Sequence, residues 1–229
     1  MMNTKRFANI CGISLKNADF FIEAMTHRSY LNENKKHAFP HNERLEFLGD
    51  AVLELIVTEY LYHEFDNPEG EMTAWRAALV NGEMLARVAR EIGIEEFLMM
   101  SKGEAKDIGK ARNYLLANAM EAIIGALYLD GGYENAKAFI YKWIIAHMEE
   151  ILEKKLYLDP KSYFQEKAQE QQNITPHYKL ISESGPDHDR VFIVGVFLGE
   201  EEVAQGTGKS KQDAQRDAAR KGLEKKQWL

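Results

Sequence analysis

Acidic residues recur on one side of an apolar stretch that runs from residue 41 to residue 63, HNERLEFLGDAVLELIVTEYLYH. Glu43, Glu46 and Asp50 follow one another at intervals of three and four residues, so on an α-helix they project within about 60° of one another. Glu54 continues the stripe by one more turn. Like charges one turn apart repel, and burying them is costly unless a cation neutralises them. The spacing therefore predicts a cationic partner for these carboxylates.

A second apolar stretch, residues 113–129, has two interior polar side chains one turn apart, Asn118 and Glu121. We expect the two stripes to face each other. Carboxylate and amide oxygens suit a hard divalent cation such as Mg²⁺ or Mn²⁺, which keeps part of its water shell and binds phosphate. The chemistry that this predicts is phosphodiester hydrolysis, because a divalent cation activates water and stabilises the anionic transition state.

The same polar residues can also have ordinary structural roles. Glu43 stands at the expected helix start, where the helix dipole favours a carboxylate, and Asn118 can be a core amide with satisfied hydrogen bonds. Glu46 and Asp50 can instead form buried salt bridges with arginine or lysine. A di-iron carboxylate bundle needs two Glu-x-x-His pairs, and no histidine of this sequence has a glutamate three residues before it.

The stretch 41–63 predicts one long helix, because it contains no proline and Asn42 is placed to cap its start. Its apolar side chains cover most of the circumference, which predicts a helix buried on nearly every side at the centre of a domain. The stretch 113–129 predicts a second buried helix. Two shorter helices are expected between them, with a break near Asn81, and a long amphipathic helix is expected over 134–155.

The helical periodicity ends where Asp159 and Pro160 interrupt it, so we place a domain boundary near Leu158. We expect residues 1–157 to form an all-α domain and residues 158–229 a small α+β domain with the order α-β-β-β-α. The elements expected in the second domain are a helix at 162–172, strands at 177–183, 190–198 and 202–205, and a helix at 210–226.

The net charge of −7 does not by itself indicate a nucleic-acid partner, but the charge is unevenly distributed. Residues 1–158 have 18 basic and 24 acidic side chains, whereas residues 159–229 have 11 and 12. Residues 209–226 alone have seven basic and three acidic side chains. The sequence therefore combines an acidic first domain with a local basic patch in the second.

The cysteine content and the hydropathy indicate the cellular compartment. The chain has one cysteine, Cys11, so it can form neither an internal disulfide nor a thiolate cage for a metal. No apolar run reaches the roughly 18 residues that a membrane helix needs, and the start of the sequence does not resemble a signal peptide. These features favour the cytoplasm.

The string NERLEFLGDAVL, residues 42–53, closely resembles the signature of the ribonuclease III family. THRSY at 26–30, EGEM at 69–72 and LLANAMEAIIGALYLDGGY at 115–133 also resemble family segments, in the family order. The resemblance implies an all-α catalytic domain of the ribonuclease III endonuclease fold. It also implies a homodimer that cleaves both strands of double-stranded RNA with Mg²⁺ or Mn²⁺, leaves 5′-phosphates and short 3′ overhangs, and processes ribosomal and messenger RNA.

The resemblance assigns roles to the acidic residues. Glu46, Asp50 and Glu121 would be metal ligands, and Asp50 and Glu121 would be essential for hydrolysis. Glu43, at the helix start, would be an accessory acid. Glu69 would be a second one, which reaches toward the active site of the dimer partner.

Asn118 occupies a ligand position where the family usually has aspartate. A carboxamide can coordinate through its carbonyl oxygen but brings no charge, so metal affinity should weaken. Two function classes follow. The first is an endoribonuclease that tolerates Asn118, and the alternative is a catalytically weak or inactive dimeric protein that only binds double-stranded RNA.

Residues 159–227 resemble a double-stranded RNA-binding domain, through SYFQE at 162–166, GPDHDR at 185–190 and GTGKSKQDAQRDAA at 206–219. Such a domain recognises the A-form shape across two minor grooves and the phosphates between them. The residues that the resemblance assigns to RNA contact are Gln165 and Glu166 in one minor groove, His188 in the next, and Lys209, Ser210, Lys211, Gln212 and Gln215 near the phosphates.

The basic patch departs from the family pattern. The family commonly has basic residues at the positions of Lys211, Gln212 and Gln215, so two charges are missing here. We expect weaker and less salt-sensitive RNA binding than the family pattern implies, unless Arg216 compensates for the missing charge.

Overall fold

The computed structural model describes residues 4–14, 16–106, 109–186 and 190–228, and the chain divides into two units, Met1–Lys154 and Lys155–Leu229. The boundary expected near Leu158 lies a few residues further along and stays a prediction. Among the described helices, none combines the length and the apolar character that a membrane crossing requires.

The described part of the first unit consists of α-helices and short 3₁₀ helices, with an isolated β-bridge between Thr26 and Met99. Its elements are α1 (Thr4–Cys11), α2 (Asp19–Ala24), α3 (Arg28–Glu33), α4 (Glu43–Glu64), α5 (Glu69–Val80), α6 (Gly82–Ile92), η1 (Ile94–Phe97), η2 (Glu104–Lys106), α7 (Lys110–Gly131), α8 (Tyr133–Trp143), η3 (Ile145–His147) and α9 (Met148–Glu153). The all-α class expected for this part of the chain is confirmed.

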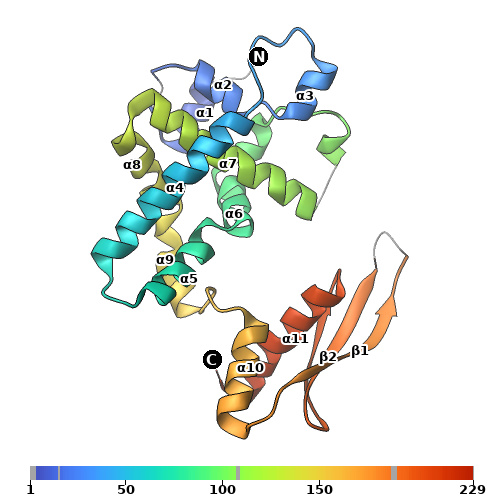
Figure 1. The fold of residues 1–229 in the computed structure, drawn as a ribbon. Coiled ribbons are helices and arrows are strands. Elements are labelled where there is room, and N and C mark those ends of the chain that lie inside the picture. The colour runs from blue at the N-terminus through green and yellow to red at the C-terminus, as the bar shows by residue number, and fades with distance from the viewer. Residues whose placement is uncertain (1–3, 15, 107–108, 187–189, 229) are drawn as a thin grey trace. The chain divides into compact units, whose positions relative to one another are not determined.

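Helices α4 and α7 cross in the middle of the unit, with their backbones close together (Figure 1). A Cβ atom added to Gly49 of α4 would lie 1.7 Å from the carbonyl oxygen of Glu121. A Cβ atom added to Gly125 of α7 would lie 2.3 Å from the carbonyl oxygen of Leu45. Neither position accepts a larger residue unless the helices move apart, because both neighbours are backbone atoms.

The long helix predicted from the sequence is confirmed as α4, but two details of the prediction are wrong. Helix α4 is not buried on nearly every side, since Phe47 is 82% and Leu55 57% exposed while Leu53 is fully buried. Asn42 makes no side-chain cap; its Nδ2 donates a hydrogen bond of 3.1 Å to the carbonyl oxygen of Ala24. Asn42 therefore ties the start of α4 to the end of α2.

The single helix predicted over 134–155 is also wrong, because the chain bends at Ile144 between α8 and η3. Ile144 has φ −110° and ψ −55°, and both it and Ile145 are buried. Consecutive residues of a straight helix point about 100° apart, so the bend allows both isoleucines to enter the core. Neither proline nor glycine occurs at this point, so no local signal marks the interruption.

The second unit has a three-stranded antiparallel sheet with the order β1-β2-β3 and two helices on one of its faces (Figure 1). Its elements are α10 (Pro160–Gln172), β1 (His177–Ser184), β2 (Val191–Leu198), β3 (Glu201–Gly208) and α11 (Lys211–Lys226). Phe164, Val196, Val203 and Leu223 bring the helices and the sheet into one core. The predicted order α-β-β-β-α is confirmed, with a longer third strand than expected.

Candidate active site and RNA-binding surface

At the helix crossing, Glu46 and Asp50 of α4 lie near enough to Glu121 of α7 for their charges to affect it. Asp50 directly follows Gly49, whose backbone lies against the carbonyl group of Glu121, and Glu46 stands one turn earlier on α4. The side chain of Asn118, one turn before Glu121 on α7, makes a hydrogen bond to the Glu46 carboxylate. The two polar stripes therefore face each other.

The carboxylates at the crossing disturb one another's titration. Burial, together with the charges of Asp50 and Glu46, raises the pKa of Glu121 to about 7. Burial and the charge of Glu43 raise the pKa of Glu46, the hydrogen bond from Asn118 lowers it, and Asp50 raises it again. Holding these groups together in their charged forms therefore costs free energy when no cation is present.

No basic side chain of the described residues forms an ion pair with Glu46, Asp50 or Glu121. The buried salt bridge considered for Glu46 and Asp50 is therefore absent from the described part of the chain. Glu54 differs, because its carboxylate pairs with Arg76 Nε of α5 at 2.9 Å. At the crossing, three acids thus have no ion-pair partner among the described side chains, whereas Arg76 neutralises the last member of the α4 stripe.

Glu43 has two basic neighbours. Arg28 Nη1 and His41 Nδ1 each lie 3.6 Å from its carboxylate, and its side chain is half exposed. Its charge is partly balanced by the protein, in contrast to that of Asp50.

The donor set at the crossing fits a hard divalent cation. The side chains of Glu46, Asp50, Asn118 and Glu121 offer only oxygen ligands once the amide of Asn118 turns its oxygen inward. In the described residues, no group of three histidine, cysteine, aspartate or glutamate side chains is already arranged as a metal site. Glu46, Asp50 and Glu121 therefore do not by themselves form a ready metal cage.

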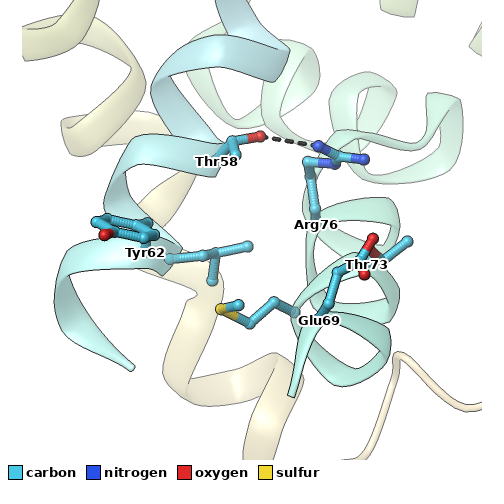
Figure 2. Close-up of a pocket in the computed structure, with 7 residues that line it drawn as sticks. Thr58, Tyr62, Glu69, Thr73 and Arg76 are labelled. Carbon is cyan, nitrogen blue, oxygen red and sulfur yellow. Dashed lines mark hydrogen bonds between the residues drawn. The ribbon is translucent and has the colours of Figure 1, made fainter. Parts of the chain in front are cut away.

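Glu69 lies apart from this cluster. It begins α5 and lines a pocket of about 220 Å³ beside the C-terminal half of α4, together with Tyr62 and Arg76 (Figure 2). Thr58 accepts a hydrogen bond from Arg76 Nη1 at the edge of this pocket. The groups that shift the pKa of Glu121 do not include Glu69. Within one chain, Glu69 is therefore not brought to the other acids.

The residues expected to contact RNA in one minor groove are accessible. Gln165 and Glu166 of α10 are exposed and line a shallow groove together with Ser162 and Gln169. His188, expected in the next minor groove, lies outside the described residues.

The residues expected near phosphates lie at or just before the start of α11. Two of them, Ser210 and Gln215, form hydrogen bonds within the same domain. Ser210 caps the helix, accepting a hydrogen bond of 3.1 Å from the Asp213 backbone N–H. Lys211 and Gln212 are exposed, as is Lys209 just before the helix. The amide oxygen of Gln215 accepts a hydrogen bond of 2.7 Å from Lys161 Nζ.

Most of the remaining basic residues of α11 are paired with acids of the same unit. Arg216 Nε lies 3.6 Å from Asp159, so the charge considered as compensation is balanced by a carboxylate. Three further pairs join Arg220 to Asp217, Lys221 to Asp217 and Lys226 to Glu201. The basic patch seen in the sequence is therefore largely neutralised.

Residues 17–148 match the family described as Ribonuclease-III-like, and residues 160–226 match the double-stranded RNA binding motif. The first match covers more than half of the chain. The chain belongs to the ribonuclease III family. Its second unit is a double-stranded RNA-binding domain, as the resemblance implied.

Relatives within the ribonuclease III family cover nearly the whole chain. Ribonuclease 3 of Bdellovibrio bacteriovorus is 42% identical over 217 residues, which are 94% of this chain and 92% of that protein. Ribonuclease 3 of Streptococcus pneumoniae is 43% identical over 203 residues, which are 88% and 87%. The chain is thus an endoribonuclease of the ribonuclease III type, and these relatives do not support the alternative of a protein that only binds RNA.

Solved structures of the family share the fold of the first unit. The nuclease domain of ribonuclease III from Campylobacter jejuni is 39% identical, with a TM-score of 0.57, and covers 64% of this chain and 97% of that one. Another structure of that domain, with a TM-score of 0.56 and 39% identity over 63% of this chain and 97% of that one, concerns flexibility in a region involved in dimer formation. The first unit therefore has the ribonuclease III nuclease fold.

Three residues that shape the two sites were not singled out from the sequence. Gly49 and Gly125 set the helix crossing, and a glycine inside a long apolar helix pattern is the signal that would have indicated them. Lys161 contacts a predicted RNA-binding residue across the second unit, and no pattern in the sequence joins the two positions.

Proposed function

We propose that this chain cleaves both strands of double-stranded RNA as a homodimer, using a divalent cation held by Glu46, Asp50, Asn118 and Glu121. The observation that carries the proposal is the set of three carboxylates at the crossing of α4 and α7, without a basic side chain of the described residues to neutralise them. Mg²⁺ is the cation that the oxygen donors favour, and Mn²⁺ can replace it.

The roles proposed for Glu46, Asp50 and Glu121 follow from how exposed their side chains are. Glu46 and Glu121 are half-buried and would hold the cation from the helix crossing, whereas Asp50 is exposed and would be within reach of a phosphate of a large substrate. A bound divalent cation supplies activation of water and neutralisation of the phosphate charge. In the hydrolysis, a water oxygen bonds to phosphorus, the bond from phosphorus to the 3′ oxygen breaks, and a proton from the water passes to that oxygen, which leaves a 5′-phosphate and a 3′-hydroxyl. Staggered cuts in the two strands, one by each subunit, would leave the short 3′ overhang. We assign the essential roles to Asp50 and Glu121.

The proposed roles of the two accessory acids, Glu43 and Glu69, are tied to the homodimer. Glu43 stands at the edge of the crossing with Arg28 and His41, and Glu69 is to reach the crossing of the partner subunit. Large apolar side chains are exposed along α4, Phe47 at 82%, Leu55 at 57% and Tyr62 at 73%, and a partner subunit packed on this helix would bury them.

The double-stranded RNA-binding domain positions the duplex. Gln165 and Glu166 are proposed to meet one minor groove and His188 the next, while Lys209, Ser210, Lys211, Gln212 and Gln215 lie near the phosphates. Ser210 contributes mainly by capping α11, whose first N–H groups and dipole attract phosphate. Processing of ribosomal and messenger RNA in the cytoplasm is the role that fits this activity.

Cleavage of a long RNA duplex with and without EDTA tests the proposal. The wild-type chain should cut in Mg²⁺ or Mn²⁺ and stop in EDTA, and Asp50→Asn and Glu121→Gln should lower the rate by at least about a hundredfold. Glu54→Gln is the matched control, because it removes a carboxylate of the same stripe that Arg76 already neutralises. Absence of cleavage by the wild-type chain at every Mg²⁺ and Mn²⁺ concentration overturns the proposal.

A further inference from the structure

Lys161 connects the two helices of the RNA-binding domain. It lies in the first turn of α10, and its Nζ donates a hydrogen bond of 2.7 Å to the amide oxygen of Gln215 on α11. Its ammonium group also lies 5.1 Å from the centre of the Tyr178 ring of β1. A lysine ammonium has three donors, and two neighbours hold this one in place.

The hydrogen bond brings a positive charge to the face of α11 that is expected to contact phosphate. Lys211 and Gln215 are separated by four residues, so they project from the same side of the helix. Because the Lys161 ammonium is bonded to Gln215, that side has two cations, one from each helix. The residue types at Lys211, Gln212 and Gln215 had predicted one.

The charge of Lys161 is not neutralised within the described residues of the unit. Lys167 pairs with Glu170, Lys221 with Asp217 and Lys226 with Glu201, whereas no such ion pair includes Lys161 or Lys211. Charges that an acid already balances add little to phosphate binding, since counterion release depends on the net charge at the contact. Among the described residues of α10 and α11 on this face, Lys161 and Lys211 therefore remain for phosphate.

We propose that Lys161, positioned by Gln215, is a phosphate-binding residue of the RNA-binding domain that replaces a charge missing from α11. The proposal rests on the proposed function, in which α11 lies against the RNA backbone. The Gln215 amide, which has no charge of its own, acts by holding the ammonium. The competing hypothesis is that Lys161 only fastens α10 to α11 and never meets RNA.

The test measures binding of the full-length chain to a fluorescent RNA duplex of about 20 base pairs, in EDTA so that the duplex stays uncut. Lys161→Met keeps an unbranched side chain of similar length and removes the charge. The slope of log affinity against log salt should fall by about one, and affinity should drop roughly three- to tenfold. Lys225→Met is the matched control, since it removes an exposed lysine at the far end of α11 and should change neither quantity.

Exchanging the residues at positions 161 and 215 distinguishes phosphate binding by Lys161 from a purely structural contact between α10 and α11. The double variant Lys161→Gln, Gln215→Lys keeps the same two residue types and puts the cation directly on α11. The single variant Lys161→Gln should have a smaller salt slope than the wild type. The double variant should recover the wild-type slope, and its circular dichroism spectrum should be unchanged. An unchanged slope in Lys161→Met, or a loss that the exchange does not recover, overturns the proposal.

The proposed function has its own readout in the same titrations. If the wild-type chain binds the duplex and Lys211→Met lowers the salt slope, α11 contacts RNA whatever Lys161 does. If the wild-type chain does not bind the duplex, the RNA-binding part of the proposed function fails first.

Discussion

Asn118 is the residue expected to have the largest effect on the metal affinity of the candidate active site. The pKa of Glu46 is raised by burial and by the charge of Glu43, and the hydrogen bond with the Asn118 amide partly offsets that rise, so without a cation Asn118 stabilises a crowded cluster of carboxylates. An aspartate at this position would lose that stabilisation and would add a fourth charge for a cation. Metal-free stability and metal affinity are therefore expected to change in opposite directions at this residue.

Asn118→Asp should lower the melting temperature of the metal-free chain by several degrees and should increase both its stabilisation by Mg²⁺ and its rate of duplex cleavage. Thermal unfolding in EDTA and in a Mg²⁺ series measures the first two effects, and a cleavage assay measures the third. Asn113→Asp adds the same charge on the same helix beside Arg90 and should leave the Mg²⁺ response unchanged. A variant that binds Mg²⁺ no better than the wild type contradicts a metal site at Asn118.

Glu121 makes metal-free stability depend on pH. Its pKa in the folded chain is about 7, above the ordinary value of 4.5, so the folded state binds the proton more tightly than the unfolded state does. The stability from this group is present below about pH 4.5 and is lost as pH rises through 7. We expect Glu121→Gln to remove a loss on the order of 2 kcal/mol between about pH 5 and pH 8, measured by urea unfolding in EDTA. Equal pH profiles for the two chains contradict the assignment.

At the scale of elements, the crossing of α4 and α7 determines which side chains lie near one another in the candidate active site. The carbonyl groups of Glu121 and Leu45 occupy the space that side chains at Gly49 and Gly125 would need. The same close approach brings Asp50 toward Glu121, so packing and chemistry depend on the same contact.

Gly49→Ala should force α4 and α7 apart, because the new Cβ would meet backbone atoms that cannot rotate away. We expect a loss of roughly 1–3 kcal/mol or more in the free energy of unfolding and a large loss of cleavage. Gly70→Ala is the control, since nothing lies within 4 Å of its Cβ position and alanine favours the helix. Urea unfolding measures both, and a Gly49→Ala chain as stable as the wild type contradicts the close crossing.

At the scale of the whole molecule, we expect the charge balance to limit RNA binding. The chain carries −7 overall, and most basic residues of α11 are paired with acids of their own unit. Few cations of the described part of this domain therefore remain to displace the counterions of an RNA duplex, and we expect shape recognition by α10 to supply much of the affinity.

Raising the salt concentration from about 50 to 200 mM should weaken duplex binding by clearly less than the roughly 10³-fold typical of proteins with six or more phosphate contacts. Fluorescence anisotropy in EDTA measures this. Gln212→Lys should increase the salt dependence by restoring a charge at the start of α11. A wild-type salt dependence as steep as that of strongly basic proteins contradicts the neutralisation seen at α11.

The sequence alone determined the local features of this protein. The spacing of Glu43, Glu46 and Asp50 on one helix face, the two classes of domain and the α-β-β-β-α order follow from helix and strand periodicity, which acts between neighbours in the chain. The site chemistry was predictable to the extent that carboxylates on an apolar helix indicate a cation.

Only the tertiary structure decided which distant residues meet. The neutralisation of Glu54 by Arg76, the bend at Ile144 and the bond from Lys161 to Gln215 depend on packing between segments far apart in the sequence. Local propensity does not contain such contacts, because their free energy comes from burial and hydrogen bonding between elements rather than from the conformation of one residue.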